Sequence, residues 1–234
     1  MNKRAPEHLE GSVELAEQEI CVCAGFRVVA GELLAGGPVE LEFFVESLGA
    51  LPLRLGVSGD SMRQRAGQFD FAARFEGSPL ADPLAAAPYM GGPVGIVQVS
   101  TGRPWHQPLV LNQFVRLEHT PERLAQGTTG RLDLACQRPL ALAATDAAAL
   151  SNDAASVVAV NLAFDLRRDD AALATLAARL FDEVMQGPLA LRERPLALLL
   201  SMRSAAHAQI DALTRHPDLS VANRAQQTTQ LLKR

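Results

Sequence analysis

The chain has 234 residues, of which 48% are hydrophobic and 21% charged, so it holds enough apolar material for a substantial core. This composition excludes an intrinsically disordered protein. The formal net charge is −4 and no basic run occurs, so we expect no nucleic-acid partner. Lysine occurs only as Lys3 and Lys233, a bias typical of GC-rich bacterial genomes, which nearly excludes any mechanism that needs an active-site lysine.

The three cysteines, Cys21, Cys23 and Cys136, are too few and odd in number for a disulfide scaffold. Cys21 and Cys23 share one face of a strand, but no other Cys or His lies nearby to complete a zinc site. We therefore expect free thiols and no metal or other cofactor. The basic N-terminus has no apolar segment behind it, and no apolar run reaches about 18 residues. These features predict a cytoplasmic protein without a signal peptide or membrane span.

Residues 1–12 are polar and predicted to be loose. The region that follows alternates between apolar and polar residues with a period of two, most clearly at 39–45, and this predicts strands. Residues 77–92 form a predicted long connection rich in Gly, Pro and Ala, and 121–125 a single helical turn. The predicted strands are 17–29, 39–45, 51–57, 69–75, 94–100, 108–117 (as a central strand), 131–136 and 158–166.

The period changes after residue 166. Apolar residues from Leu173 to Val184 follow a helical spacing, with Asp169 or Asp170 available as a cap and Gly187-Pro188 as a stop. A second helix is predicted from about Pro195 to Leu213, ended by His216-Pro217. The polar tail from Val221 is predicted to be a short helix or disordered.

Strands without interleaved helices predict a mainly β fold, an antiparallel β-sandwich of immunoglobulin-like or jelly-roll type over residues 13–166. A helical hairpin at 168–214 is expected to pack on this sandwich, followed by a polar tail at 215–234, which makes the chain α+β overall. Residues 38–55, in which a strand ends in Ser47-Leu48-Gly49 before a second strand, resemble the opening hairpin of immunoglobulin-like modules. Such modules mainly mediate protein contacts, so the resemblance implies an interaction function.

Residues 55–62, which end in Gly59-Asp60-Ser61-Met62, resemble the nucleophile segment of LexA-type self-cleaving peptidases. That family pairs its serine with a lysine made neutral by burial. No lysine lies between residues 3 and 233, so this activity is excluded.

The same segment resembles the first block of GDSL/SGNH esterases, which implies Ser61 as nucleophile, Asn152 as a block residue, and Asp211 and His216 as its partners. Asp211 and His216 are five residues apart where the family has three, and the βα units of its sheet are missing. A serine hydrolase, with His216 or His106 as base, is therefore the alternative function. In the other interpretation Ser58-Gly59-Asp60-Ser61 is a turn.

The single tryptophan, Trp105, and its neighbour His106 are candidate binding residues, together with Tyr89 and Met90 in the long connection. The alternative for Trp105 is an aromatic side chain that closes the edge of the sandwich. His106 and His119 alone are too few ligands to predict a metal site. With no complete catalytic set, the leading hypothesis is a non-enzymatic interaction or scaffold protein that binds another protein or itself.

Overall fold

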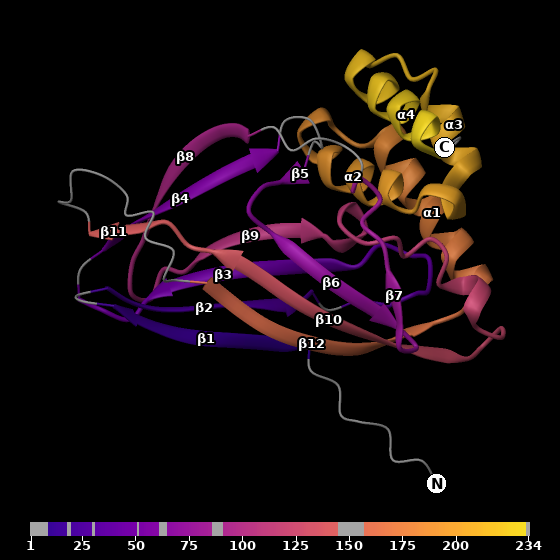
Figure 1. Cartoon of the computed structure of the whole chain (residues 1–234). Helices are drawn as coiled ribbons and strands as arrows, with labels where there is room; N and C mark the ends of the chain where they lie inside the picture. The colour runs from indigo at the N-terminus through magenta and orange to yellow at the C-terminus, as the bar shows by residue number, and fades with distance from the viewer. Residues whose placement is uncertain are drawn as a thin grey trace, which may run out of the picture.

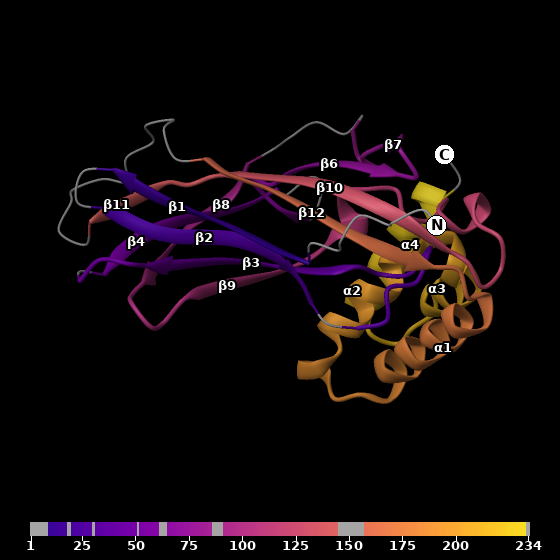
Figure 2. The same ribbon diagram turned by 90° about the horizontal axis from the view of Figure 1, so that it is seen from below.

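The computed structural model describes residues 9–17, 20–29, 31–50, 52–60, 65–85, 91–144 and 157–232. In these residues the chain is mainly β, with three antiparallel sheets followed by a C-terminal group of helices (Figure 1). The helices gather at one end of the sheets in both views (Figures 1 and 2). Among the described residues, no helix has both the length and the apolar character needed to cross a membrane.

The first sheet has the order β1-β2-β3-β9 and contains the strand with the clearest alternation in the sequence. Leu41, Phe43 and Val45 of β3 are fully buried, whereas Glu42 and Phe44 face outward, as predicted. The strands are β1 (Glu10–Glu17), β2 (Ile20–Val28), β3 (Glu40–Ser47) and β9 (Trp105–Val110).

The second sheet has the order β12-β10-β6-β7. Its centre is β10, which pairs with β12 on one side and with β6 on the other. Leu132, Leu134 and Cys136 point inward from β10 and are buried, because they occupy alternate positions of the strand. The strands are β12 (Val157–Arg167), β10 (Thr129–Pro139), β6 (Asp70–Phe75) and β7 (Ser78–Leu80).

The third sheet is built on β4, which pairs with β11 and β5 on one side and with β8 on the other. After β10 ends, the chain leaves the second sheet and enters β11, so one continuous segment links the two sheets. The strands are β4 (Leu53–Asp60), β5 (Arg65–Ala66), β8 (Gly91–Val99) and β11 (Leu142–Ala144).

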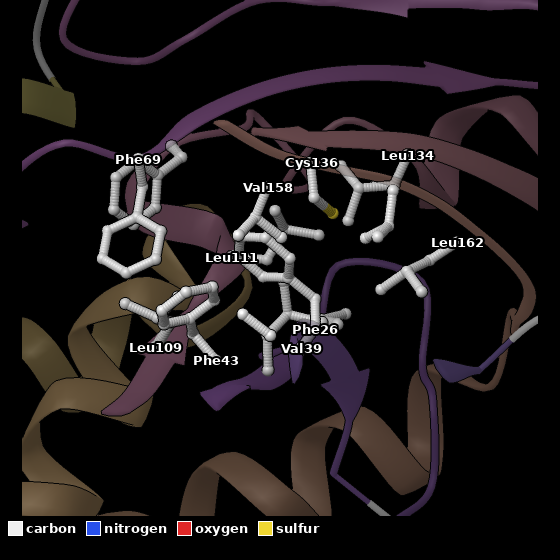
Figure 3. Close-up of a cluster of buried hydrophobic side chains, with 14 of the residues drawn as sticks. Phe26, Val39, Phe43, Phe69, Leu109, Leu111, Leu134, Cys136, Val158 and Leu162 are labelled. Atoms are coloured by element: carbon white, nitrogen blue, oxygen red, sulfur yellow. The ribbon is translucent and has the colours of Figure 1, made fainter. Parts of the chain in front are cut away.

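All three sheets contribute side chains to one core. Figure 3 shows residues of the first and second sheets in this core, among them Phe43 and Leu134. Phe26 and Phe43 of the first sheet lie with their ring centroids 4.8 Å apart and are fully buried. Leu134 and Cys136 enter the same core from the second sheet, and Leu55 enters it from the third. The shared core is consistent with a β-sandwich.

The first difference from the sequence prediction is at the N-terminus. Strand β1 begins at Glu10, so residues 10–12, predicted to be loose, belong to a strand. Only Val13 and Leu15 alternate here with polar neighbours, and both are half-buried, so the alternation is shorter than the run of about 4–8 residues that predicts a strand. The predicted connection at 77–92 likewise contains β7 and the start of β8.

The prediction of a central strand at 108–117 is wrong, because β9 ends at Val110 and lies at an edge of the first sheet. A short 3-10 helix (Leu111–Gln113) follows. Asn112 is 1% exposed, its Oδ1 accepts a hydrogen bond from the Val39 N–H at 2.9 Å, and its Nδ2 donates to the Gly37 carbonyl at 2.9 Å. The buried amide satisfies backbone groups that no neighbouring strand reaches, so the segment turns where apolar composition alone predicted a strand.

The first predicted helix is confirmed. In α1 (Asp170–Gln186) the Asp169 carboxylate accepts the Ala172 N–H at 2.9 Å, and Gly187 follows the last turn. The second predicted helix is broken into α2 (Glu193–Ser201), a 3-10 helix (Arg203–Ala206) and α3 (His207–Leu213). Arg203 has φ +50°, and a residue in this left-handed region cannot continue an α-helix. The tail forms α4 (Leu219–Leu232), so the predicted hairpin is a larger helical group.

The helices have a core of their own, to which Leu34 contributes from the segment before β3. Two contacts between charged side chains connect the helical group to the rest of the chain. Arg194 of α2 donates two hydrogen bonds to the Glu40 carboxylate, at 2.8 and 2.9 Å. Arg203 lies 3.6 Å from Glu118, and both side chains are largely buried.

Candidate functional site

The predicted catalytic residues are only partly within the described structure. Ser61 and Asn152 lie outside the described residues, while β4 extends to Asp60, so Gly59 and Asp60 belong to a strand. His216 is 7% exposed, and its Nδ1 accepts the Asp218 N–H at 3.0 Å.

This hydrogen bond does not favour His216 as a base. In a serine triad the histidine Nδ1–H donates a hydrogen bond to a carboxylate, which leaves Nε2 free to accept the serine proton. The neutral His216 ring, with Nδ1 accepting, carries its proton on Nε2. The hydrolase stays a prediction, and comparing fluorophosphonate labelling of the wild type with that of Ser61→Ala tests it.

The predicted binding residues Trp105 and His106 point to opposite faces of β9, because they are adjacent in a strand. Trp105 is half-buried and its ring meets Phe43 edge-on at 6.4 Å, as in the edge-closing interpretation. His106 lies outside, with Nδ1 3.0 Å from the Glu42 carboxylate. Tyr89 and Met90 lie outside the described residues, so a binding role for all four residues stays a prediction.

No group of three or more His, Cys, Asp or Glu side chains able to hold a metal ion occurs in the described part of the chain. His119 lies 4.0 Å from Glu122, an exposed contact. Cys21, Cys23 and Cys136 are free thiols, and burial raises the pKa of Cys136 to about 12. A thiol with this pKa is protonated at neutral pH and is a poor nucleophile.

A cleft of about 450 Å³ lies between the residues that precede β3 and the helices α1 and α2. Its charged side chains are all ion-paired: Glu40 with Arg194, Glu32 with Arg167, and Arg179 with Glu183. None of these groups is left to attract a ligand, so the cleft gives no functional assignment.

Strand β8 has one unpaired edge. One edge of β8 pairs with β4, from Val99 opposite Leu53 to Gly91 opposite Asp60. The other edge of β8 meets no strand that the structure describes. Natural edge strands are commonly protected by charged residues or proline. Strand β8 carries Pro93 near its start, but the segment Val94–Val99 has neither, and Ile96 within it is 51% exposed. Figure 1 shows the β4–β8 pair at the margin of the molecule.

The most unusual buried group is Arg138, which points inward from β10 in line with Cys136 and is 1% exposed. Its guanidinium carbon lies 4.5 Å from the Phe43 ring centroid, 4.8 Å from that of Phe69 and 5.3 Å from that of Trp105. One Nη donates to the Gly56 carbonyl at 3.4 Å. We call Arg138, the three rings and the Gly56 carbonyl the Arg138 cage. All three sheets contribute to it, because β10, β3, β9 and β4 meet there.

The Arg138 guanidinium lacks the partners that a buried charge normally has. Its Nε and Nη1 have no hydrogen-bond partner, and no carboxylate of the described residues pairs with it. Burial lowers the pKa of Arg138 below its usual value, to about 10, so the group remains charged at neutral pH. This shift corresponds to about 3 kcal/mol of unfavourable burial, a cost of the same order as the three cation–π contacts, at about 0.5–2 kcal/mol each, can offset.

We expect Arg138→Met to leave the free energy of unfolding unchanged or to raise it by about 2 kcal/mol, because an apolar side chain of similar volume removes the unpaired charge. Urea unfolding at neutral pH measures the difference. The control is Arg27→Met, an exposed arginine 5.7 Å from the Phe44 ring, for which we expect a change within about 0.5 kcal/mol. A loss of more than about 1 kcal/mol in Arg138→Met would show that the charge stabilises the fold.

The Arg138 cage and the β8 edge were not predicted from the sequence, although each leaves a signal there. Arg138 continues the inward positions of Leu134 and Cys136, so strand alternation alone places a charge in the core. Residues 91–102 contain no charged side chain.

Comparison of the sequence with known protein families and with curated proteins finds no match.

Proposed function

We propose that the protein is a non-enzymatic interaction or scaffold protein that binds another protein, or a second copy of itself, through its β-sheet surface. The proposal takes the fold to be a sandwich of immunoglobulin-like or jelly-roll type. The observation that carries it is the unpaired, uncharged edge of β8 with Ile96 half exposed.

An unpaired strand edge presents N–H and C=O groups in the spacing that another strand requires. A partner strand that adds to β8 satisfies these groups and extends the third sheet, as in β-strand addition. Ile96 then packs against a side chain of the added strand, because cross-strand neighbours lie about 4.5–5.5 Å apart. The edge therefore favours a strand-forming protein partner over a small molecule.

Light scattering coupled to size exclusion, over a range of concentrations, tests self-association. We expect Ile96→Lys to weaken it at least about tenfold, because a lysine must be desolvated or must leave the interface. The matched control is Leu189→Lys, which replaces an apolar residue that is 69% exposed in the helical part of the chain. This variant should associate like the wild type.

A wild type that is monomeric at every concentration would remove self-association but leave another protein as partner. Capture from a lysate by the immobilised wild type and by immobilised Ile96→Lys then tests whether the β8 edge binds another protein. A partner retained by the wild type and lost with Ile96→Lys supports the proposal. Equal capture by both proteins, or none by either, contradicts it.

A further inference from the structure

We propose that the Arg138 cage is a binding site for a monocarboxylate that carries an apolar or aromatic substituent. The site is independent of the β8 edge. Its motivation is the pair of guanidinium nitrogens, Nε and Nη1, that lack any acceptor in a side chain that is 1% exposed. A buried polar group without a partner calls for a specific explanation, and a ligand that accepts hydrogen bonds from it is one.

The chemistry of the cage indicates the charge of the ligand. The cage offers one positive charge, that of Arg138. Among the described residues, no other cation stacks on its three rings. A single carboxylate neutralises this charge and accepts charge-assisted hydrogen bonds from the guanidinium. A doubly charged phosphate would bring an uncompensated charge into an apolar core, which is costly.

The three aromatic rings of the cage indicate that the substituent on the carboxylate is apolar or aromatic. Phe43, Phe69 and Trp105 surround the guanidinium, and the Phe43 ring also lies 5.5 Å from Phe69, edge-on. A ligand that reaches the free nitrogens has to pass these rings, so a ring or an alkyl group on the carboxylate gains apolar contact. Small acids with such a substituent and apolar peptides with a free C-terminus share this chemistry.

The route to Arg138 passes Trp105. Phe43 is fully buried and Phe69 is 9% exposed, whereas Trp105 is half-buried on the edge strand β9. Trp105 is therefore the ring of the cage whose displacement we expect to uncover the guanidinium. Trp105 is also the only tryptophan of the chain, so tryptophan fluorescence comes from this one position.

Titration of the wild-type protein with benzoate, followed by Trp105 fluorescence, tests the proposal. Benzamide has the same ring without the charge, and chloride at equal ionic strength has the charge without the ring. We expect a saturable change with benzoate and none with benzamide or chloride. This comparison needs no variant, so a variant that fails to fold does not affect it.

The variants Arg138→Met and Arg27→Met assign the response to one arginine. We expect Arg138→Met to bind benzoate at least about tenfold more weakly, the effect of losing a hydrogen bond to a charged group, and Arg27→Met to bind like the wild type. Equal responses to benzoate and benzamide, or unchanged affinity in folded Arg138→Met, would overturn the proposal. Ile96→Lys should keep benzoate binding, which separates this site from the β8 edge.

The source of the carboxylate is distinguished by a second titration. A short apolar peptide with a free C-terminus is compared with the same peptide amidated. Tighter binding of the free peptide than of benzoate assigns the site to a chain terminus, and tighter binding of benzoate assigns it to small acids. Equal binding of the free and amidated peptides together with no response to benzoate contradicts the site.

Discussion

Alanine at Phe43 is expected to lower the free energy of unfolding by about 3–5 kcal/mol, the usual cost of truncating a buried phenylalanine. Phe43 is fully buried, and its ring lies 4.8 Å from Phe26 and 5.5 Å from Phe69. It also forms a wall of the Arg138 cage, 4.5 Å from the guanidinium. The truncation therefore removes packing between the sheets and part of the cation–π contact at the same time.

Phe44→Ala is the matched control, because it changes the same residue type at the next position of β3. Phe44 is half-buried on the outer face, where it contacts the exposed Arg27. We expect this variant to lose about 1 kcal/mol or less, a typical value for a position outside the core. Chemical denaturation of both variants gives the comparison, and similar losses would mean that the inward face of β3 does not form the core.

Methionine at Glu118 is expected to destabilise the protein by about 3–5 kcal/mol, because it removes the carboxylate that forms an ion pair with a largely buried arginine. The Glu118 side chain is 4% exposed and lies 3.6 Å from Arg203, which is 11% exposed. Burial lowers the pKa of Arg203, and the Glu118 charge opposes that shift. Because Arg203 belongs to the helical group and Glu118 to the segment after β9, the loss should loosen the contact between helices and sheets.

Two further variants test the contribution of the Glu118–Arg203 contact, beside which the more exposed Arg116 lies 3.8 Å from Glu118. Glu122→Met removes a carboxylate that is 78% exposed, and we expect a change within about 0.5 kcal/mol. The double variant Glu118→Met/Arg203→Met removes both charges at similar volume and should recover most of the lost stability. Thermal unfolding and hydrogen exchange of residues 203–213 measure the effect. A double variant less stable than Glu118→Met alone would exclude an unpaired charge as the cause.

Local patterns in the sequence determined most of the strands and the first helix. The alternation in β3 predicted which side chains are buried, because successive residues of a strand face opposite sides. Asp169 and Gly187 marked the ends of α1, because a side-chain acceptor and a following glycine act on the nearest turn. Both signals operate within a few residues and need no knowledge of the rest of the fold.

The tertiary structure decided the features that depend on distant residues. Asn112 ends β9 by bonding to Gly37 and Val39, more than 70 positions away in the sequence. Arg203 leaves the helical conformation next to Glu118, so a continuous apolar pattern contains a break. The unpaired edge of β8 and the Arg138 cage arise only where the three sheets meet. Periodicity specifies the face that a residue occupies, whereas the neighbours opposite that face are specified by the packing of distant strands.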